Sequence, residues 1–247
     1  GGDSPQDVVT GLLLNYGSLM VFGLVATALL ISIVYGLMRL YHSTDSDGSP
    51  LHPELNAMTL AQFRPYLTGQ MRPAWKSIGA MTLIGIVMLV LFVALAAGAA
   101  AVFESDESVG VVIVLLLYVS LFALLPPLAM VVPAFSFDNV GFFSGMKKGI
   151  VYGFKTWRGV MAVTFVFALI ISMVNGFLSL PWMVFSILRM FAAVGRESMA
   201  FAATPWFSFL TYLFTLLYLF VCYLGYSAML VAIAYQYGHA HEVIDGE

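Results

Sequence analysis

Five long stretches of this 247-residue chain contain no Asp, Glu, Lys or Arg. They are residues 8–38, 77–103, 108–137, 159–188 and 198–238. The shortest has about 27 residues, whereas roughly 20 apolar residues in a helix are enough to cross the ~30 Å hydrocarbon layer of a bilayer. The sequence therefore predicts an integral membrane protein that crosses the membrane five times.

The composition agrees with this prediction and indicates the kind of spanning element. Hydrophobic residues make up 61% of the chain and charged residues 9%, against about 45–50% and about 25% in soluble domains. Unpaired backbone amides are costly in hydrocarbon, and the five runs lack the polar alternation of a membrane barrel, so helices are expected. We predict an all-α fold, a bundle of five transmembrane helices.

The spans are separated by segments that predict further organisation. A polar linker at 43–50 (STDSDGSP) divides the chain into an N-terminal helix with its linker, residues 1–50, and a membrane domain, residues 51–247. Residues 59–76 and 138–158 are amphipathic and are expected to lie in the headgroup layer. Pro65 and Pro73 should break the first of these segments into short helices, and Pro126, Pro127 and Pro133 should kink the third span.

The sequence predicts a tandem duplication in which each copy begins with one of the two amphipathic segments. Residues 59–137 and 139–237 each read as interfacial segment, span, turn and span. Their first spans begin after RPAWK at 72–76 and KTWR at 155–158, and their second spans contain AM at 129–130 and 228–229, then AFSF at 134–137 and AYQY at 234–237. Similar boundary residues also arise from the general preferences of membrane interfaces, which is the alternative reading.

Most basic residues fall on one predicted side of the membrane. Eight of the ten Lys and Arg residues lie beside or within the loops after the first and third spans. The positive-inside rule then places the N-terminus outside and the C-terminus inside the cytoplasmic (inner) membrane. These cations serve orientation alone, or they also bind anionic lipid headgroups. The headgroup candidates are Arg64, Arg72, Lys76, Lys147, Lys148, Lys155 and Arg158.

Residue types that drive catalysis or transport are absent from membrane depth. An ion or proton relay normally needs ionisable side chains there, and Ser or Thr nucleophiles would need a nearby base. We predict no catalytic residue, no metal site and no cofactor. Asn175 is a possible intramembrane polar site, with an interhelical hydrogen bond as the simpler reading. His239 and His241 are expected in a solvated tail, and the net charge of −3 gives no support for nucleic-acid binding.

A ladder of glycines runs through the second amphipathic segment. The four residues recur every fourth position, which produces a smooth groove along a helix. Two readings remain open: another helix packs closely into the groove, or the glycines only lighten an interfacial helix. The ladder consists of Gly141, Gly145, Gly149 and Gly153.

Residues 59–247 resemble a group of bacterial multi-pass proteins that are described as membrane domains of glycerophosphodiester phosphodiesterases. The resemblance lies in the repeated interfacial helix and two-span hairpin, the AYQY motif at 234–237 and the tail at His241 and Glu242. It implies a catalytic partner domain elsewhere. This chain lacks the metal-binding carboxylate cluster that such a domain would carry, so no catalytic residue is transferred to it.

These features predict a non-enzymatic membrane subunit, scaffold or anchor of a larger assembly. Its expected partners are membrane lipids and other membrane subunits. The alternative is a small transporter or lipid-handling protein, with a cavity near Pro126, Pro127 and Asn175.

Overall fold

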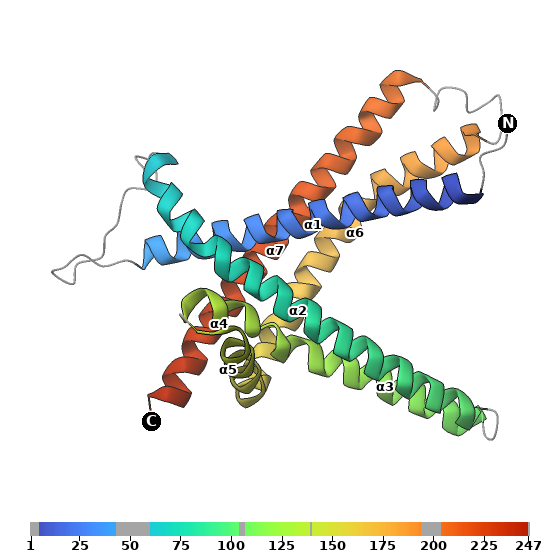
Figure 1. The fold of residues 1–247 in the computed structure, drawn as a ribbon. Helices are drawn as coiled ribbons and strands as arrows, with labels where there is room; N and C mark the ends of the chain where they lie inside the picture. Colours follow the sequence, from blue (N-terminus) through green and yellow to red (C-terminus); the bar gives the residue numbers. More distant parts are fainter. Residues whose placement is uncertain (1–4, 43–59, 104–106, 139, 194–203, 247) are drawn as a thin grey trace. The chain divides into compact units, whose positions relative to one another are not determined.

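The computed structural model describes residues 5–42, 60–103, 107–138, 140–193 and 204–246, and these ranges are almost entirely helical. Five helical stretches are long and apolar enough to cross a membrane, so the prediction of an all-α protein with five spanning segments is confirmed. The helices described are α1 (Pro5–Tyr41), α2 (Leu60–Phe103), α3 (Glu107–Leu128), α4 (Val131–Phe137), α5 (Phe142–Lys155), α6 (Trp157–Ala193) and α7 (Pro205–Asp245) (Figure 1).

The chain forms two compact units, which we describe separately. Unit 1 comprises residues 1–161 and 233–247, and unit 2 comprises residues 162–232. Both α6 and α7 therefore contribute to each unit. The predicted division at residue 50 lies outside the described residues.

In unit 1, α2 and α3 run side by side as a long helical hairpin, and α1 crosses the N-terminal part of α2 (Figure 1). The crossing is close because Gly36 has no side chain. A Cβ at this position would lie 3.3 Å from the Tyr66 carbonyl oxygen. Ser32 and Tyr35 on the same part of α1 are fully buried. This contact attaches α1 to the hairpin.

The predicted interruption at Pro65 and Pro73 is wrong, because α2 continues through both prolines. The first amphipathic segment is thus the beginning of a 44-residue helix that also contains the second span. An interior proline costs a helix about 3 kcal/mol. Gln70, Ala74 and Ser77 are buried at helical spacing in this region, and their packing outweighs that cost.

The third predicted span is divided into two helices: α3 ends at Leu128, directly after Pro127, and Pro133 lies in the first turn of α4. Pro127 has no N–H group for the carbonyl of Ala123, four residues earlier. The indole Nε1–H of Trp157 donates to that carbonyl instead, over 3.1 Å. After a turn at Ala129 and Met130, α4 begins at Val131. A neighbouring side chain therefore satisfies the carbonyl that the proline leaves free.

The buried centre of unit 1 lies where α2, α4 and α5 meet. Ala80 on α2 packs with Val131 and Phe135 on α4, and partly buried side chains from α2 and α5 surround them. The closest approach is between α5 and the chain from α3 to α4. A Cβ at Gly145 would lie 2.6 Å from the ring of Phe135, and one at Gly149 would lie 2.5 Å from the Cα of Val131.

The third glycine of this contact, Gly153, faces the carbonyl of Pro127 even more closely. Gly145, Gly149 and Gly153 thus meet Phe135, Val131 and Pro127, so both segments advance in steps of four residues in opposite directions. Such a register is that of two antiparallel helical faces in contact. Gly141 has no atom near its Cβ position and precedes α5 as its N-cap.

The two halves of the predicted repeat differ in local structure. The first amphipathic segment is continuous with its span in α2, whereas α5 and α6 are separated at Thr156. The AM pair at 129–130 forms the turn between α3 and α4, whereas the pair at 228–229 lies inside α7. The duplication remains a prediction.

In unit 2, α6 and α7 pack through aromatic and small residues. The ring of Phe185 contacts the rings of Phe207 and Phe214, with centroid distances of 5.0 and 5.2 Å. Farther along, Gly225 lies against the side chain of Ile171. Partner residue numbers rise on one helix as they fall on the other, as expected for an antiparallel pair.

The close approach at Gly149 predicts the effect of a single methyl group. In Gly149→Ala the new Cβ would meet backbone atoms of Val131, which cannot rotate away, so we expect a loss of about 1–3 kcal/mol in stability. Thermal unfolding in a mild detergent would measure it. Gly85→Ala is the matched control, because Gly85 lies inside α2 with nothing within 4 Å. Equal unfolding temperatures for the two variants would contradict the packing described here.

Candidate functional site

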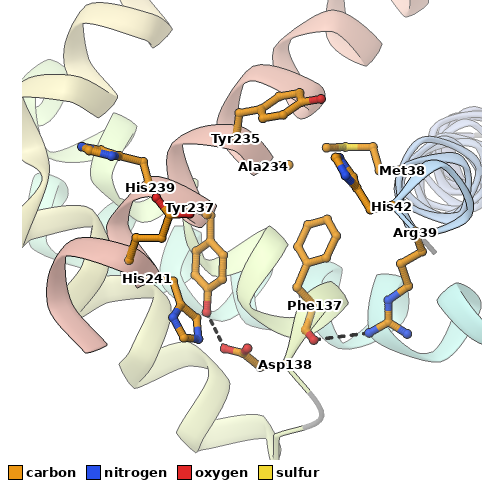
Figure 2. Close-up of a pocket in the computed structure, with 12 residues that line it drawn as sticks. Met38, Arg39, His42, Phe137, Asp138, Ala234, Tyr235, Tyr237, His239 and His241 are labelled. Atoms are coloured by element: carbon orange, nitrogen blue, oxygen red, sulfur yellow. Dashed lines mark hydrogen bonds between the residues drawn. The ribbon is translucent and has the colours of Figure 1, made fainter. Parts of the chain in front are cut away.

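A pocket of about 700 Å³ lies within unit 1. One wall is the C-terminal end of α1, with Met38, Arg39 and His42. Phe137 and Asp138, at the end of α4, form a second wall, and the stretch of α7 from residue 234 to residue 242 forms a third. Figure 2 shows the ring of Phe137 between the α1 side chains and those of α7. Pockets of this volume accommodate small ligands.

Arg39 contributes a guanidinium group to the lining of the pocket. Its Nη2 donates to the carbonyl oxygen of Phe137 over 3.3 Å (Figure 2). The last carbonyls of a helix lack intrahelical donors, so Arg39 caps α4 from a different helix. Within the described ranges, Arg39 has no ion pair with a carboxylate. A guanidinium has five N–H donors, and among the described residues Arg39 uses one of them, on the carbonyl of Phe137.

Next to the pocket, α5 and α7 are joined by a set of interacting side chains that we call the polar cluster. Its members are Asp138, Lys148, Tyr152, Tyr237, His241 and Asp245. The carboxylate of Asp138 accepts a hydrogen bond of 2.5 Å from the Tyr237 hydroxyl and pairs with Lys148 Nζ at 2.8 Å. Asp138 thus connects the end of α4 with both other helices.

Asp245, near the end of α7, is the second carboxylate of the polar cluster. It accepts a hydrogen bond from the hydroxyl of Tyr152. Lys148 Nζ and His241 Nε2 each lie 3.6 Å from the same carboxylate oxygen. The rings of Tyr152 and Tyr237 stack with centroids 5.3 Å apart, and Lys148 Nζ lies 5.0 Å from the centroid of the Tyr152 ring. Charge and ring contacts thus hold the last turns of α7 against α5.

The protonation of the α5 groups follows from these contacts. Burial lowers the pKa of Lys148, but its hydrogen bonds to Asp138 and Tyr152 outweigh that effect and raise the pKa above its ordinary value of 10.5. Burial, together with the hydrogen bond to Asp245, raises the pKa of Tyr152 above 10.0. At neutral pH, Lys148 is therefore a cation and Tyr152 a neutral donor.

The candidate headgroup cations differ in their surroundings. Lys148 belongs to the polar cluster, and Lys76 is half-buried, with Nζ donating to the carbonyl oxygen of Val140 over 3.1 Å. These two cations have protein partners. The other candidates are exposed: Arg64, Arg72, Lys147, Lys155 and Arg158.

The histidine pair lies on a helix, because α7 continues to Asp245. Both residues are exposed, as expected for a solvated segment, and the segment is helical. Figure 2 shows the rings of His239 and His241 directed to different sides, as an i, i+2 spacing on a helix requires. No group of three potential ligands for a metal ion occurs in the described part of the chain.

Asn175 belongs to unit 2 and is not among the residues that line the pocket of unit 1. Its Oδ1 is 3.4 Å from Sγ of Cys222, within hydrogen-bonding range for sulfur. This contact joins α6 to α7, as in the interhelical reading of the sequence.

The pocket and the polar cluster were not anticipated from the sequence. One available signal was the spacing of four residues between Lys148 and Tyr152, and between His241 and Asp245, which places each pair on one helical face. The sequence predicts a solvated segment after Tyr237, and this expectation gives no indication that the segment pairs with α5.

The chain was compared with models of protein families, with curated proteins and with solved structures, and none of the three comparisons finds a match. The resemblance to the phosphodiesterase membrane domains therefore remains a prediction from the sequence.

The polar cluster predicts how the end of α7 responds to the loss of one cation. In Lys148→Gln both carboxylates lose their shared counter-charge, so local opening of residues 233–245 should become easier by about 1 kcal/mol. Faster amide hydrogen exchange in these residues would show it. Lys147→Gln removes a neighbouring exposed cation that has no ion pair with a described residue, and it should leave exchange unchanged. If amide exchange at residues 233–245 is no faster in Lys148→Gln than in the unmodified protein, Lys148 does not stabilise the end of α7.

Proposed function

We propose that this protein is a non-enzymatic integral membrane subunit or scaffold of a larger membrane assembly. The observation that carries the proposal is the small number of residues the spans bury within the chain. In each of the four later spans, only 6% of an apolar stretch of 18 residues is buried. The outer faces of these helices are therefore available to lipid or to the helices of a partner.

Small residues on α2 favour a protein partner on that face. Lipid tails are as apolar as Leu, so helices associate in membranes mainly where small residues allow close approach. The second half of α2 contains Ala94, Ala97 and Gly98, all exposed, and nothing lies within 4 Å of the Cβ position at Gly98. This surface offers another helix the same kind of contact that α5 makes through its glycines.

The groups of the polar cluster support a non-enzymatic role. In each of the two carboxylates, Oδ2 accepts a hydrogen bond from a tyrosine hydroxyl and faces the shared Lys148. A general base has to reach a substrate proton, whereas these groups hold two helices together. The sequence resemblance, which implies a catalytic partner domain elsewhere, is consistent with such a subunit.

A bulky residue at Gly98 should separate assembly from folding. We expect Gly98→Leu to reduce co-purification of partner subunits after gentle extraction at least about tenfold, because a side chain would hold the partner helix away. The unfolding temperature of the isolated protein should not fall, because the position is open. Leu89→Phe is the control, since a nine-residue offset places Leu89 on the opposite face of α2. Undiminished co-purification with Gly98→Leu, or a lone monomer in native membranes, contradicts the proposal.

The pocket favours a second candidate, a small transporter or lipid-handling protein. Its lining combines a cation, aromatic rings and histidines next to membrane-spanning helices. Asn175 does not line this pocket, so Asn175→Leu tests the separate route that the sequence predicts. Flux or lipid transfer that this variant abolishes, without loss of folding, would favour the second candidate over the scaffold.

For orientation, we propose the arrangement that the basic residues predict, with the N-terminus outside and the C-terminus inside the cytoplasmic membrane. In a Cys222→Ser background, an impermeant maleimide added to intact cells should label Ser108→Cys and not Lys147→Cys, because both positions are exposed but lie on opposite predicted sides. Permeabilised cells, in which both should be labelled, control for reactivity. The reverse pattern in intact cells excludes this topology.

A further inference from the structure

The pocket of unit 1 lies at the ends of two membrane-spanning helices, where phospholipid headgroups are found. Its α1 wall, with Met38, Arg39 and His42, begins where the first charge-free run ends. Its α7 wall belongs to the last spanning candidate, 205–245. Arginine at such a boundary sits among phosphate groups.

The charges of the lining suit a phosphate group next to α1. Arg39 donates one hydrogen bond to the carbonyl oxygen of Phe137 and has no ion pair within the described ranges. Asp138 on the α4 wall has its Oδ2 paired with Lys148 and hydrogen-bonded by Tyr237, and it forms no ion pair with Arg39. A guanidinium binds phosphate oxygens through paired, charge-assisted hydrogen bonds.

The rest of the lining fits the other parts of a lipid headgroup region. Met38, Phe137 and Ala234 supply apolar surface for the glycerol end, and the exposed carboxylate of Glu242 provides a counter-charge for an ammonium group. An inorganic anion alone would leave the apolar surface uncovered.

We propose that this pocket binds the phosphate-bearing headgroup of a membrane phospholipid, with Arg39 as the principal phosphate ligand and His42 beside it. The site is separate from the seven cations expected from the sequence to bind headgroups. It does not depend on the proposed scaffold role, because a subunit with or without partners can hold such a lipid.

The first test uses the unmodified full-length protein in detergent micelles. A phosphatidylethanolamine with a photoreactive group near its glycerol is added, irradiated and mapped by peptide mass spectrometry. Adducts should concentrate in residues 38–42 and 234–242. Adducts spread along the spans without enrichment in these two stretches would overturn the proposal, and this outcome requires no variant to fold.

The second test compares two arginines of unit 1. Arg39→Gln should lower adduct yield about tenfold or more, as expected for the loss of a charge-assisted pair of hydrogen bonds. The adduct yield of Arg39→Lys should lie between those of Arg39→Gln and the unmodified protein, since lysine keeps the positive charge but lacks the planar guanidinium group. Arg64→Gln removes an exposed cation of α2 that does not line the pocket, and it should change the yield less than twofold. Equal losses in Arg39→Gln and Arg64→Gln would show general attraction to cations and refute a defined site.

Inorganic phosphate distinguishes the two sources of a phosphate group. We expect millimolar phosphate not to reduce labelling at the two stretches, because it lacks the apolar contacts. Full protection by phosphate would assign the pocket to a free anion and reject the lipid.

Discussion

The close approach of α5 to the chain around Pro127 and Val131 is the contact on which unit 1 depends. Backbone lies against backbone there, because Gly149 and Gly153 place only hydrogens in the interface. In lipid, where apolar burial gives helices little reason to associate, such contact is a main source of affinity. Tyr152 is buried beside these glycines, and Lys148 precedes Gly149, so the same contact brings the α5 members of the polar cluster to α7.

The carbonyl groups at the break between α3 and α4 need hydrogen-bond donors from elsewhere. A broken helix leaves them without intrahelical donors, and each unpaired carbonyl costs free energy in an apolar medium. In unit 1, side chains from other helices donate these hydrogen bonds. Trp157 of α6 bonds Ala123, Ser77 of α2 bonds Val132 over 3.3 Å, and Arg39 of α1 caps Phe137. The irregular segment is therefore tolerated because three helices supply its donors, and it helps to hold them together.

The length of the runs without charged residues was sufficient to predict the helical class and all five spans, because the thickness of the hydrocarbon layer sets the length that a spanning helix needs. Local rules were less successful where packing overrides them, as at Pro65 and Pro73, which α2 passes without interruption. The glycine ladder predicted a groove on α5, but the spacing of the glycines could not identify the segment that packs into it. The pocket and the polar cluster depend on pairing α7 with α5 across about 90 residues of sequence, and no local pattern records such a contact.

The four-residue register of α5 also restricts which changes of length this protein can accept. One residue added between Gly145 and Gly149 would turn all that follows by about 100° about the helix axis. Side chains would then point at the Pro127 carbonyl, where only hydrogens now fit. Homologous chains should accordingly vary along α5 by exchange of residues and hardly ever by insertion or deletion.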